Sequence, residues 1–393
     1  MEKTFAILGA GMQGTAAAYD LAKFANPKSI KMGDVSLEQA KHNAWRVNDL
    51  IGSAICEPFE VDALDAKSLS AFFADVDVVI SCVPYWMHPQ IAKVAVETKT
   101  SMVDLGGNTE ITMETLKLDE EARAAGVTLV PDTGLAPGLV NSLGLYLVEQ
   151  MDEVESIQLY CGVLPQNPKP PFNYKLTFNV EGLVTEYDFK AVTVRNHEIH
   201  LVDTLDELEM LKVDELGEME AFTTSGGTST APYTLKDRVK NYDYKTIRYP
   251  GHCERIRIFR DFGFWGEEPI RVDGVEVKPR HLFYKVFGEA LKKFEDLDLC
   301  IVRAVGKGKK NGEPFTGQID IFDKQDEVTG FTSMERLTGF SAAIFAEQIA
   351  AGYVEKGALR YENALTGQKF VEEIQKRGVG LKFSGHKAVV AGV

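Results

Sequence analysis

A glycine-rich turn followed by a single carboxylate is the pattern in this sequence that most clearly indicates chemistry. The apolar run 4–8 leads into Gly9-Ala10-Gly11-Met12-Gln13-Gly14, and a helical stretch follows. Glycines let the backbone approach a pyrophosphate, and the free N–H groups at the helix start bind it. Asp34 lies 20 residues after Gly14, where a carboxylate binds the adenosine ribose and repels a 2′-phosphate. Strand, glycines, helix and acid in this order predict an NAD site, against the alternative of a turn that binds nothing.

Further cofactor contacts are expected where the other predicted strands end. The carboxyl ends of parallel strands meet at one edge of a sheet, and ligands of open α/β sheets bind in the crevice there. The predicted cofactor-binding residues are therefore Gly9, Gly11, Met12, Gln13, Gly14, Asp34, Asp62, Cys82, Val83, Pro84 and Asp104.

Lys175 and His252 are the predicted catalytic residues. Lys175 follows the proline-rich loop 165–173, which would hold it rigidly, and an unperturbed histidine titrates near neutral pH. Lys175 can act as a base only if burial or nearby positive charge lowers its pKa, and if it stays charged it suits a substrate carboxylate instead. For His252 the ordinary alternative is a structural role. Three basic residues remain candidates to bind a substrate carboxylate: Lys175, Arg248 and Arg255.

A loop rich in glycine, serine and threonine, Thr223–Thr230, is a third candidate for ligand binding. Its glycines let the backbone approach a ligand, and its hydroxyl and N–H groups can bind a carboxylate; a flexible linker would have a similar composition. Asp132 could hold a substrate ammonium group. The predicted substrate-binding residues are Asn108, Asp132, Tyr174, Thr228, Ser229 and Arg248.

The first third of the chain alternates strand-like and helical runs, which predicts a doubly wound parallel sheet. This α/β Rossmann domain is expected to span residues 1–135. After the first two strands, further strands are expected at 54–62, 76–83, 101–105 and 127–131, with helices at 66–74, 88–97 and 113–125.

From about residue 152 the pattern changes to long alternating runs, which predict an α+β second domain with a mixed or antiparallel sheet, residues 136–332. Asp273-Gly274 and Asn311-Gly312 predict hairpin turns. A helix rich in small residues over 334–353 predicts close packing against another element. The expected strands are 156–164, 174–187, 189–202, 246–259 and 297–305.

Composition limits the classes of function. The 393 residues carry a formal net charge of −15, and nucleic-acid binding needs a basic face. No apolar run is long enough to cross a membrane. A strand that begins by residue 4 leaves no room for a signal peptide, so a cytoplasmic location is expected. The five cysteines lack the paired spacing of a zinc site, so no metal is expected.

In its glycine-rich turn and in several later stretches, the chain resembles the saccharopine dehydrogenase-like oxidoreductases. This resemblance implies a Rossmann domain completed by the C-terminal segment 333–393, a second domain with a mixed sheet, and a substrate between them. It also implies a homodimer or a dimer of dimers. The resemblance is carried by Gly9–Gly14, Asp132–Gly138, Tyr174–Phe178, Thr224–Thr230, Arg248–His252 and Thr338–Ala343.

Within this family the chain looks most like the lysine 6-dehydrogenases. That resemblance implies NAD-dependent oxidation of the ε-amine of L-lysine to 2-aminoadipate 6-semialdehyde, which cyclises to piperideine-6-carboxylate, with release of ammonia. Saccharopine-forming members often carry aspartate where Ala136 stands and tryptophan where Val180 stands, so a different substrate is expected. The alternatives are condensation or cleavage, as in saccharopine and carboxynorspermidine dehydrogenases, and a non-catalytic NAD-binding regulator.

Overall fold

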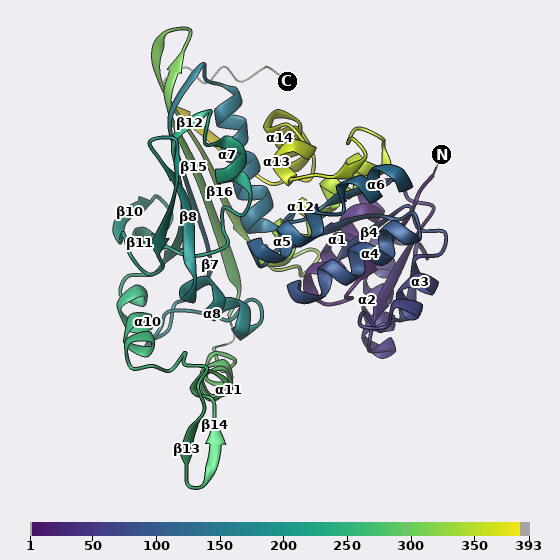
Figure 1. Cartoon of the computed structure of the whole chain (residues 1–393), viewed down its shortest axis with the longest axis horizontal. Helices are drawn as coiled ribbons and strands as arrows, with labels where there is room; N and C mark the ends of the chain where they lie inside the picture. The colour runs from purple at the N-terminus through teal and green to yellow at the C-terminus, as the bar shows by residue number, and fades with distance from the viewer. Residues whose placement is uncertain (1, 295, 386–393) are drawn as a thin grey trace.

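A seven-stranded parallel sheet forms the N-terminal domain in the computed structural model, which describes residues 2–294 and 296–385 (Figure 1). The strand order β17-β6-β5-β4-β1-β2-β3 reverses direction at β1, and every neighbouring pair is parallel. The predicted doubly wound sheet is confirmed. Its strands are β1 (Thr4–Leu8), β2 (Ser29–Asp34), β3 (Cys56–Glu60), β4 (Val78–Ser81), β5 (Ser101–Asp104), β6 (Thr128–Val130) and β17 (Gly357–Ala358).

Helices cover both faces of this sheet, so its strands are apolar on both sides. In β1, Phe5 and Ile7 pack into one buried cluster, and Ala6 and Leu8 pack into another on the opposite face. The predicted helix 113–125 is divided in two, because Leu118 leaves helical geometry (φ −82°, ψ 15°). The helices are α1 (Met12–Phe24), α2 (Leu37–Ile51), α3 (Ala66–Phe73), α4 (His88–Glu97), α5 (Thr109–Leu116) and α6 (Asp119–Ala125).

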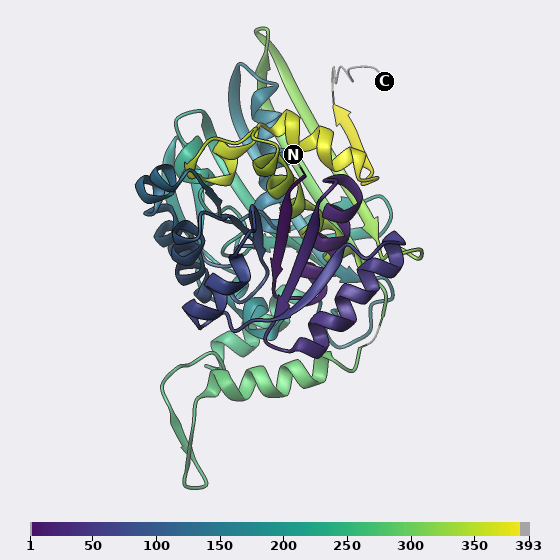
Figure 2. The same ribbon diagram turned by 90° about the vertical axis from the view of Figure 1, so that its right-hand side faces the viewer.

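The C-terminal segment returns to this domain and completes it (Figure 2). Helix α12 (Ser333–Ala350) packs on α1, and β17 adds the edge strand beside β6. After α14 (Gly367–Lys376), the guanidinium of Arg377 donates a 2.8 Å hydrogen bond to the carboxylate of Asp20 on α1. Both side chains are almost inaccessible, and burial raises the pKa of Asp20 to about 7 in spite of Arg377. A buried ion pair therefore fixes the residue that follows α14 to the first helix.

A second sheet, of nine strands, forms the other domain (Figure 1). Its path is β10-β11-β12-β7-β15-β16-β18, and β8 and β9 extend from β12. Only β7 and β12 are parallel neighbours, so the sheet is mixed. The strands are β7 (Glu153–Pro165), β8 (Lys190–Arg195), β9 (Glu198–Asp203), β10 (Glu209–Val213), β11 (Gly217–Thr223), β12 (Val239–Arg248), β15 (Asp298–Lys310), β16 (Glu313–Lys324) and β18 (Leu381–Gly385).

Three of the predicted strands of this domain differ from the structure. The run 174–187 holds no strand: Asn179 accepts a 2.6 Å hydrogen bond from the Gly182 N–H and starts helix α8 (Val180–Asp188). The run 189–202 is two strands, β8 and β9. The run 246–259 changes from strand to helix, because Gly251 (φ +86°) turns the chain into α10 (His252–Asp261). Local turn and cap residues therefore prevail over the alternating pattern.

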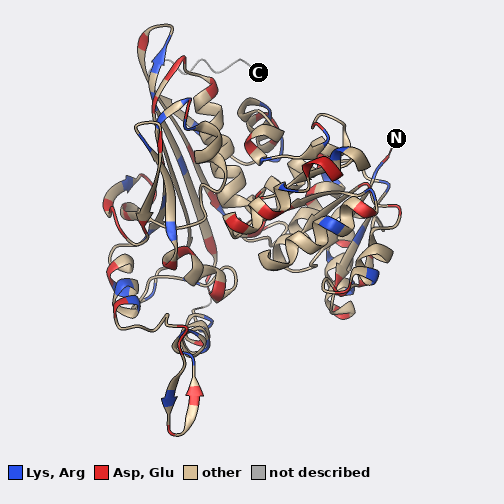
Figure 3. Ribbon diagram, in the orientation of Figure 1, with Lys and Arg blue, Asp and Glu red and all other residues tan. Residues whose placement is uncertain are grey.

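A two-stranded hairpin projects from the second domain between α10 and α11 (Pro279–Leu291) (Figures 1 and 2). It pairs β13 (Ile270–Val272) with β14 (Val275–Val277), and the predicted Asp273-Gly274 turn joins them. The predicted Asn311-Gly312 turn likewise joins β15 to β16. Acidic and basic residues are scattered along the chain of both domains (Figure 3). Across the described residues, every helix is too short or too polar to span a bilayer.

We expect Gly339→Ala to destabilise the protein by about 1–3 kcal/mol, because overpacking a tight contact forces the backbone to shift. A Cβ at Gly339 would lie 2.7 Å from the Ala17 nitrogen and 2.8 Å from the Gln13 carbonyl oxygen. Gly380→Ala is the control, since a Cβ there meets no atom within 4 Å. Urea unfolding followed by fluorescence compares the two variants. Equal stabilities would show that the contact between α1 and α12 is not tight.

Candidate active site

A cleft of about 370 Å³ opens over the carboxyl ends of β1, β2 and β4. Gly9 (φ +96°) lies in its wall, and a Cβ there would come within 2.9 Å of the Cys82 backbone. A Cβ at Gly14 would overlap the Gly9 carbonyl oxygen, so both positions require glycine. Seven predicted cofactor residues line the cleft: Gly9, Gly11, Asp34, Asp62, Cys82, Val83 and Pro84. Four do not: Met12, Gln13 and Gly14, in the first turn of α1, and Asp104, at the end of β5.

Asp34 ends β2 and holds its carboxylate at the glycine turn. It accepts hydrogen bonds from the N–H groups of Ala10 (3.0 Å) and Ser36 (3.0 Å) and from the Gln39 amide (3.2 Å). These contacts fix the carboxylate toward the cleft while it keeps further lone pairs for a ligand. The position suits a ribose whose two hydroxyl groups donate to one carboxylate.

A second, smaller cavity of about 60 Å³ lies where the two domains meet. Leu135 and Ala136, in the loop after β6, form one side together with Met334 at the start of α12. The remaining wall comes from β7, β12, α8 and the segment before α8. It contributes the aromatic side chains Tyr174, Phe178 and Tyr244, and two charged side chains, Glu186 and Arg248.

Arg248 ends β12, and its side chain is buried, with 4% exposed. Its Nε donates to the Tyr187 hydroxyl (3.1 Å), its Nη1 to the Ile247 carbonyl (3.0 Å), and its Nη2 to the Glu186 carboxylate (3.3 Å). The guanidinium carbon lies 5.0 Å from the centre of the Tyr174 ring. A planar guanidinium held in this way presents its remaining N–H groups to a carboxylate.

His252 supports Arg248 through Tyr187. Its Nδ1 lies 3.4 Å from the Phe172 carbonyl oxygen and its Nε2 lies 3.1 Å from the Tyr187 hydroxyl. A carbonyl can only accept, so Nδ1 carries the proton and Nε2 accepts from Tyr187. The Tyr187 oxygen in turn accepts from Arg248. Burial and the charge of Arg248 lower the pKa of His252 to about 3, so the ring stays neutral.

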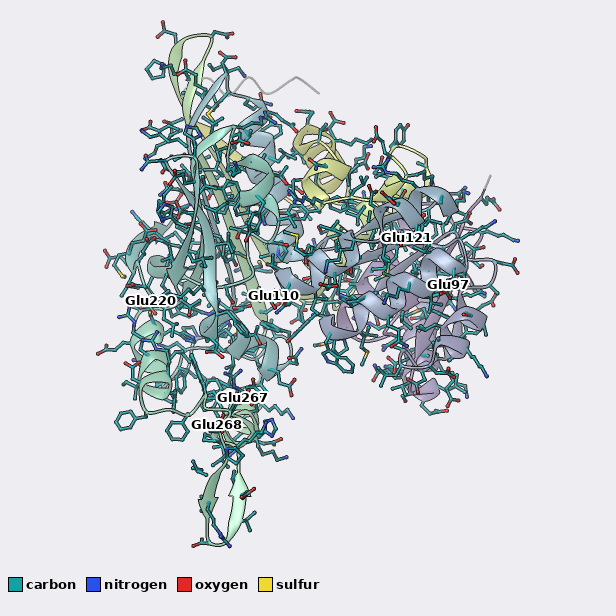
Figure 4. The ribbon with its side chains drawn as sticks, in the orientation of Figure 1. Glu97, Glu110, Glu121, Glu220, Glu267 and Glu268 are labelled. Carbon is teal, nitrogen blue, oxygen red and sulfur yellow. The ribbon has the colours of Figure 1, made fainter. Side chains whose placement is uncertain are left out.

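Glu220 fixes the helix that carries His252. This residue of β11 lies beside the start of α10 (Figure 4). Its carboxylate accepts hydrogen bonds from the N–H groups of Gly251 (2.7 Å) and Cys253 (2.6 Å). A carboxylate at a helix N-terminus satisfies unpaired donors and complements the helix dipole. Glu220 therefore fixes the backbone on either side of His252, and Phe172 and Tyr187 fix its ring.

Sequence models of two domains match the chain in the order of its two structural domains. Residues 5–130 match the saccharopine dehydrogenase NADP binding domain, and residues 134–379 match the saccharopine dehydrogenase C-terminal domain. The chain belongs to the saccharopine dehydrogenase family. Its N-terminal domain is accordingly a domain that binds NAD or NADP.

Relatives in this family are similar over part of their length. A Saccharomyces cerevisiae saccharopine dehydrogenase (NADP⁺, L-glutamate-forming) is 27% identical over 246 residues, which is 60% of this chain and 52% of that protein. The mouse mitochondrial alpha-aminoadipic semialdehyde synthase is 32% identical over 54% of this chain and 24% of its own length. The chain thus spans about half the length of the yeast relative and about a quarter of the length of the mouse relative.

Two solved structures share the fold over nearly the whole chain. A yeast saccharopine dehydrogenase (L-Glu forming) superposes with a TM-score of 0.76 at 20% identity, covering 98% of this chain and all of that one. The homospermidine synthase of Legionella pneumophila, solved with NAD, superposes with a TM-score of 0.64 at 12% identity, covering 98% and 92% of the two chains.

The two predicted catalytic residues lie outside the cavity lining of this family member. His252 uses both ring nitrogens on protein partners and stays neutral, so it positions Arg248 instead of moving protons. The Lys175 ammonium donates a hydrogen bond to the Asp296 carbonyl, and Lys175 is not among the residues that line the cavity. Residues 174–179 are not a strand, so Lys175 lacks the strand framework expected for it, and its catalytic role stays a prediction.

Asp132 joins the two domains. Its buried carboxyl accepts hydrogen bonds from the hydroxyls of Thr112 (2.8 Å) and of Ser229, which belongs to the second domain. Burial and the nearby carboxylate of Asp104 raise the pKa of Asp132 to about 7. The predicted residues Asp132 and Ser229 therefore meet each other, and neither lines the cavity.

The other predicted substrate residues divide between the cavity and structural roles. Tyr174 and Arg248 line the cavity. Asn108 caps α5 by accepting from the Glu110 N–H (2.9 Å), and the Thr228 hydroxyl donates to the Val192 carbonyl (3.0 Å). The glycine-rich loop thus braces the second domain at Thr228 and contacts the first at Ser229.

Glu186 is the charged residue of the cavity lining that sequence reasoning missed. It lies in the run 174–187. On a strand over these residues, Glu186 would be interpreted as one of the acidic residues that face solvent. Asn179 was the available signal, because an N-cap residue followed by Val180-Glu181-Gly182-Leu183 is compatible with a helix start. Within the described residues, no three His, Cys, Asp or Glu side chains are arranged to hold a metal ion.

We expect His252→Gln to flatten the acid dependence of stability. The folded protein holds this ring with a pKa of about 3, whereas the unfolded chain protonates it near pH 6.5. The wild-type protein therefore loses stability from this group as pH falls from about 6.5 toward 3. The raised pKa values of Asp20 and Asp132 act in the opposite direction, but equally in both proteins. Urea unfolding at pH 4, 5, 6 and 7 measures the difference, and parallel curves would contradict a neutral buried His252.

Proposed function

We propose that the chain is an NAD-dependent amino-acid dehydrogenase that oxidises the ε-carbon of L-lysine. One observation carries the proposal: a dinucleotide cleft that contains Asp34 accompanies a buried Arg248 in a cavity at the domain junction. A fixed guanidinium suits the α-carboxylate of an amino acid, and the aromatic walls suit its aliphatic chain. Ala136 also lines this cavity, where saccharopine-forming members often carry an aspartate.

The charges of the larger cleft support NAD over NADP. The charged side chains of its lining are the carboxylates of Asp34 and Asp62, and no lysine or arginine of the described part of the chain lines it. A 2′-phosphate would meet two like charges without a counter-ion, whereas ribose hydroxyls can donate to Asp34.

The proposed reaction converts L-lysine, NAD⁺ and water into 2-aminoadipate 6-semialdehyde, NADH, ammonium and a proton. NAD, when bound, accepts the hydride from the carbon that bears the amine. That carbon releases hydride only when the nitrogen has a free lone pair, and an unperturbed lysine amine has a pKa of about 10.4. Arg248 holds the carboxylate end of the substrate, while Tyr174 and Tyr244 exclude water from around its chain.

Saccharopine cleavage is the second candidate function. The relatives at 27% and 32% identity carry the names saccharopine dehydrogenase and alpha-aminoadipic semialdehyde synthase. Saccharopine has additional carboxylates, which would need further cations at the cavity. Among the described residues, Arg248 is the only basic side chain that lines the cavity, which favours the smaller substrate.

We expect NADH to form when the protein is mixed with NAD and L-lysine without any keto acid, with one ammonia released per NADH. The rate should rise from pH 7 to pH 10, because the reactive amine is the neutral form. Absorbance at the wavelength of reduced nicotinamide and an ammonia assay measure both products. Turnover of saccharopine with no turnover of lysine would replace the proposal by the second candidate.

We expect Asp34→Ala to weaken NAD binding by about tenfold or more, since hydrogen bonds to a charged group are lost. The same change removes the repulsion toward a 2′-phosphate, so the gap between NAD and NADP should narrow. Glu57→Ala is the matched control, because it removes an exposed carboxylate from the neighbouring strand β3. Calorimetric titration with each cofactor measures the two affinities. An unchanged preference would remove Asp34 from cofactor selection.

A further inference from the structure

Glu186 is a carboxylate that lines the small cavity, and the proposed reaction assigns it no role. It lies in the last turn of α8 and lines the same cavity as Arg248. About a third of its side chain (31%) remains accessible, against 4% for Arg248. A small solute in the cavity can therefore reach Glu186.

The turn that carries Glu186 is fixed from both sides. Asn179 caps the start of α8, and the N–H of Ser225 donates a 2.8 Å hydrogen bond to the Glu186 carbonyl. The Ser225 hydroxyl donates a further 2.8 Å bond to the Thr185 carbonyl. The glycine-rich loop thus holds the last turn of the helix, so the carboxylate stands on a positioned backbone.

The contact between Glu186 and Arg248 leaves both groups with unused capacity. Among the described residues Arg248 is the only donor to the Glu186 carboxylate, and their 3.3 Å separation exceeds the usual 2.7–2.9 Å of a charge-assisted bond. A carboxylate accepts several hydrogen bonds, and a guanidinium donates five. Arg248 makes three with described residues: to Glu186, Tyr187 and Ile247.

We propose that Glu186 binds the α-ammonium group of the substrate while Arg248 binds its α-carboxylate. This inference rests on the proposed function, and it names the head group that the cavity selects. An α-amino acid carries ammonium and carboxylate on one carbon, and the pair presents the opposite charges side by side. A polyamine lacks the carboxylate, and an ω-amino acid without an α-amine lacks the partner of Glu186.

The electrostatics of the cavity are consistent with a cationic ligand beside Glu186. Burial raises the pKa of Glu186, and the charge of Arg248 acts against that shift. An ammonium group at the free carboxylate oxygen would add a second positive charge and compensate the desolvation.

A purely structural role for Glu186 makes a different prediction. If Glu186 serves only as the counter-ion of Arg248, its loss disturbs the guanidinium and weakens every carboxylate ligand alike. If it binds ammonium, its loss weakens only ligands that carry the α-amine. A pair of ligands that differ in this one group separates the two roles.

Calorimetric titration of L-norleucine and hexanoate into the NAD-saturated protein provides this test. Both ligands carry the carboxylate and the aliphatic chain, and neither has an ε-amine to oxidise. The wild-type protein should prefer norleucine by about tenfold or more, since a charged hydrogen bond is at stake. Glu186→Gln should reduce this preference to about threefold or less and leave hexanoate binding within about twofold.

Two further variants serve as a control and as a second test. Glu181→Gln makes the same chemical change at an exposed position of the same helix and should behave as wild type. Glu186→Asp keeps the charge beside Arg248 but shortens the side chain by one methylene. It should weaken the binding of norleucine more than the binding of hexanoate. This variant provides the test if Glu186→Gln does not fold.

The outcomes separate this proposal from the proposed function. Equal weakening of both ligands in the Glu186 variants, or no wild-type preference, would overturn the head-group assignment. A preference that depends on Glu186, in a protein that does not oxidise lysine, would support the assignment and refute only the proposed reaction.

Discussion

A permanent positive charge inside the protein is the constraint on which the second domain depends. Arg248 cannot lose its proton and has little access to water, so protein groups must satisfy it. Tyr187 and Glu186 on α8 do so from one side, and the chain of bonds through His252 anchors α10 from another. Removing one partner of a buried charge typically costs about 3–5 kcal/mol. The same requirement brings α8, α10 and β12 together and leaves a guanidinium facing the cavity.

Two further buried acids fix other contacts between distant parts of the chain. Asp132 accepts a hydrogen bond from Ser229 across the junction of the domains, and Asp20 on α1 binds Arg377, which follows α14. The C-terminal segment thereby packs on the first helix, and Met334 reaches the cavity beside Ala136. The small cavity belongs to neither domain alone, because its walls come from the domain linker, the second sheet and α12.

Sequence patterns predicted the elements well wherever one pattern was uninterrupted. The parallel sheet followed from apolar runs separated by helical ones, and the two hairpin turns followed from Asp-Gly and Asn-Gly pairs. Prediction failed over 174–187 and 246–259, where alternating side chains suggested strands. At these places the Asn179 cap and the Gly251 turn start helices. The misassigned run also concealed Glu186.

The sequence by itself determined the dinucleotide cleft, because its parts are local. The glycine turn and Asp34 lie on two adjacent strands joined by one helix, so their spacing along the chain sets their spacing in space. Only the tertiary structure decided the small cavity and the role of each residue near it. Ala136, Tyr174, Glu186, Arg248 and Met334 are distant in sequence. Their meeting depends on how two domains pack, and no periodicity along the chain records that contact.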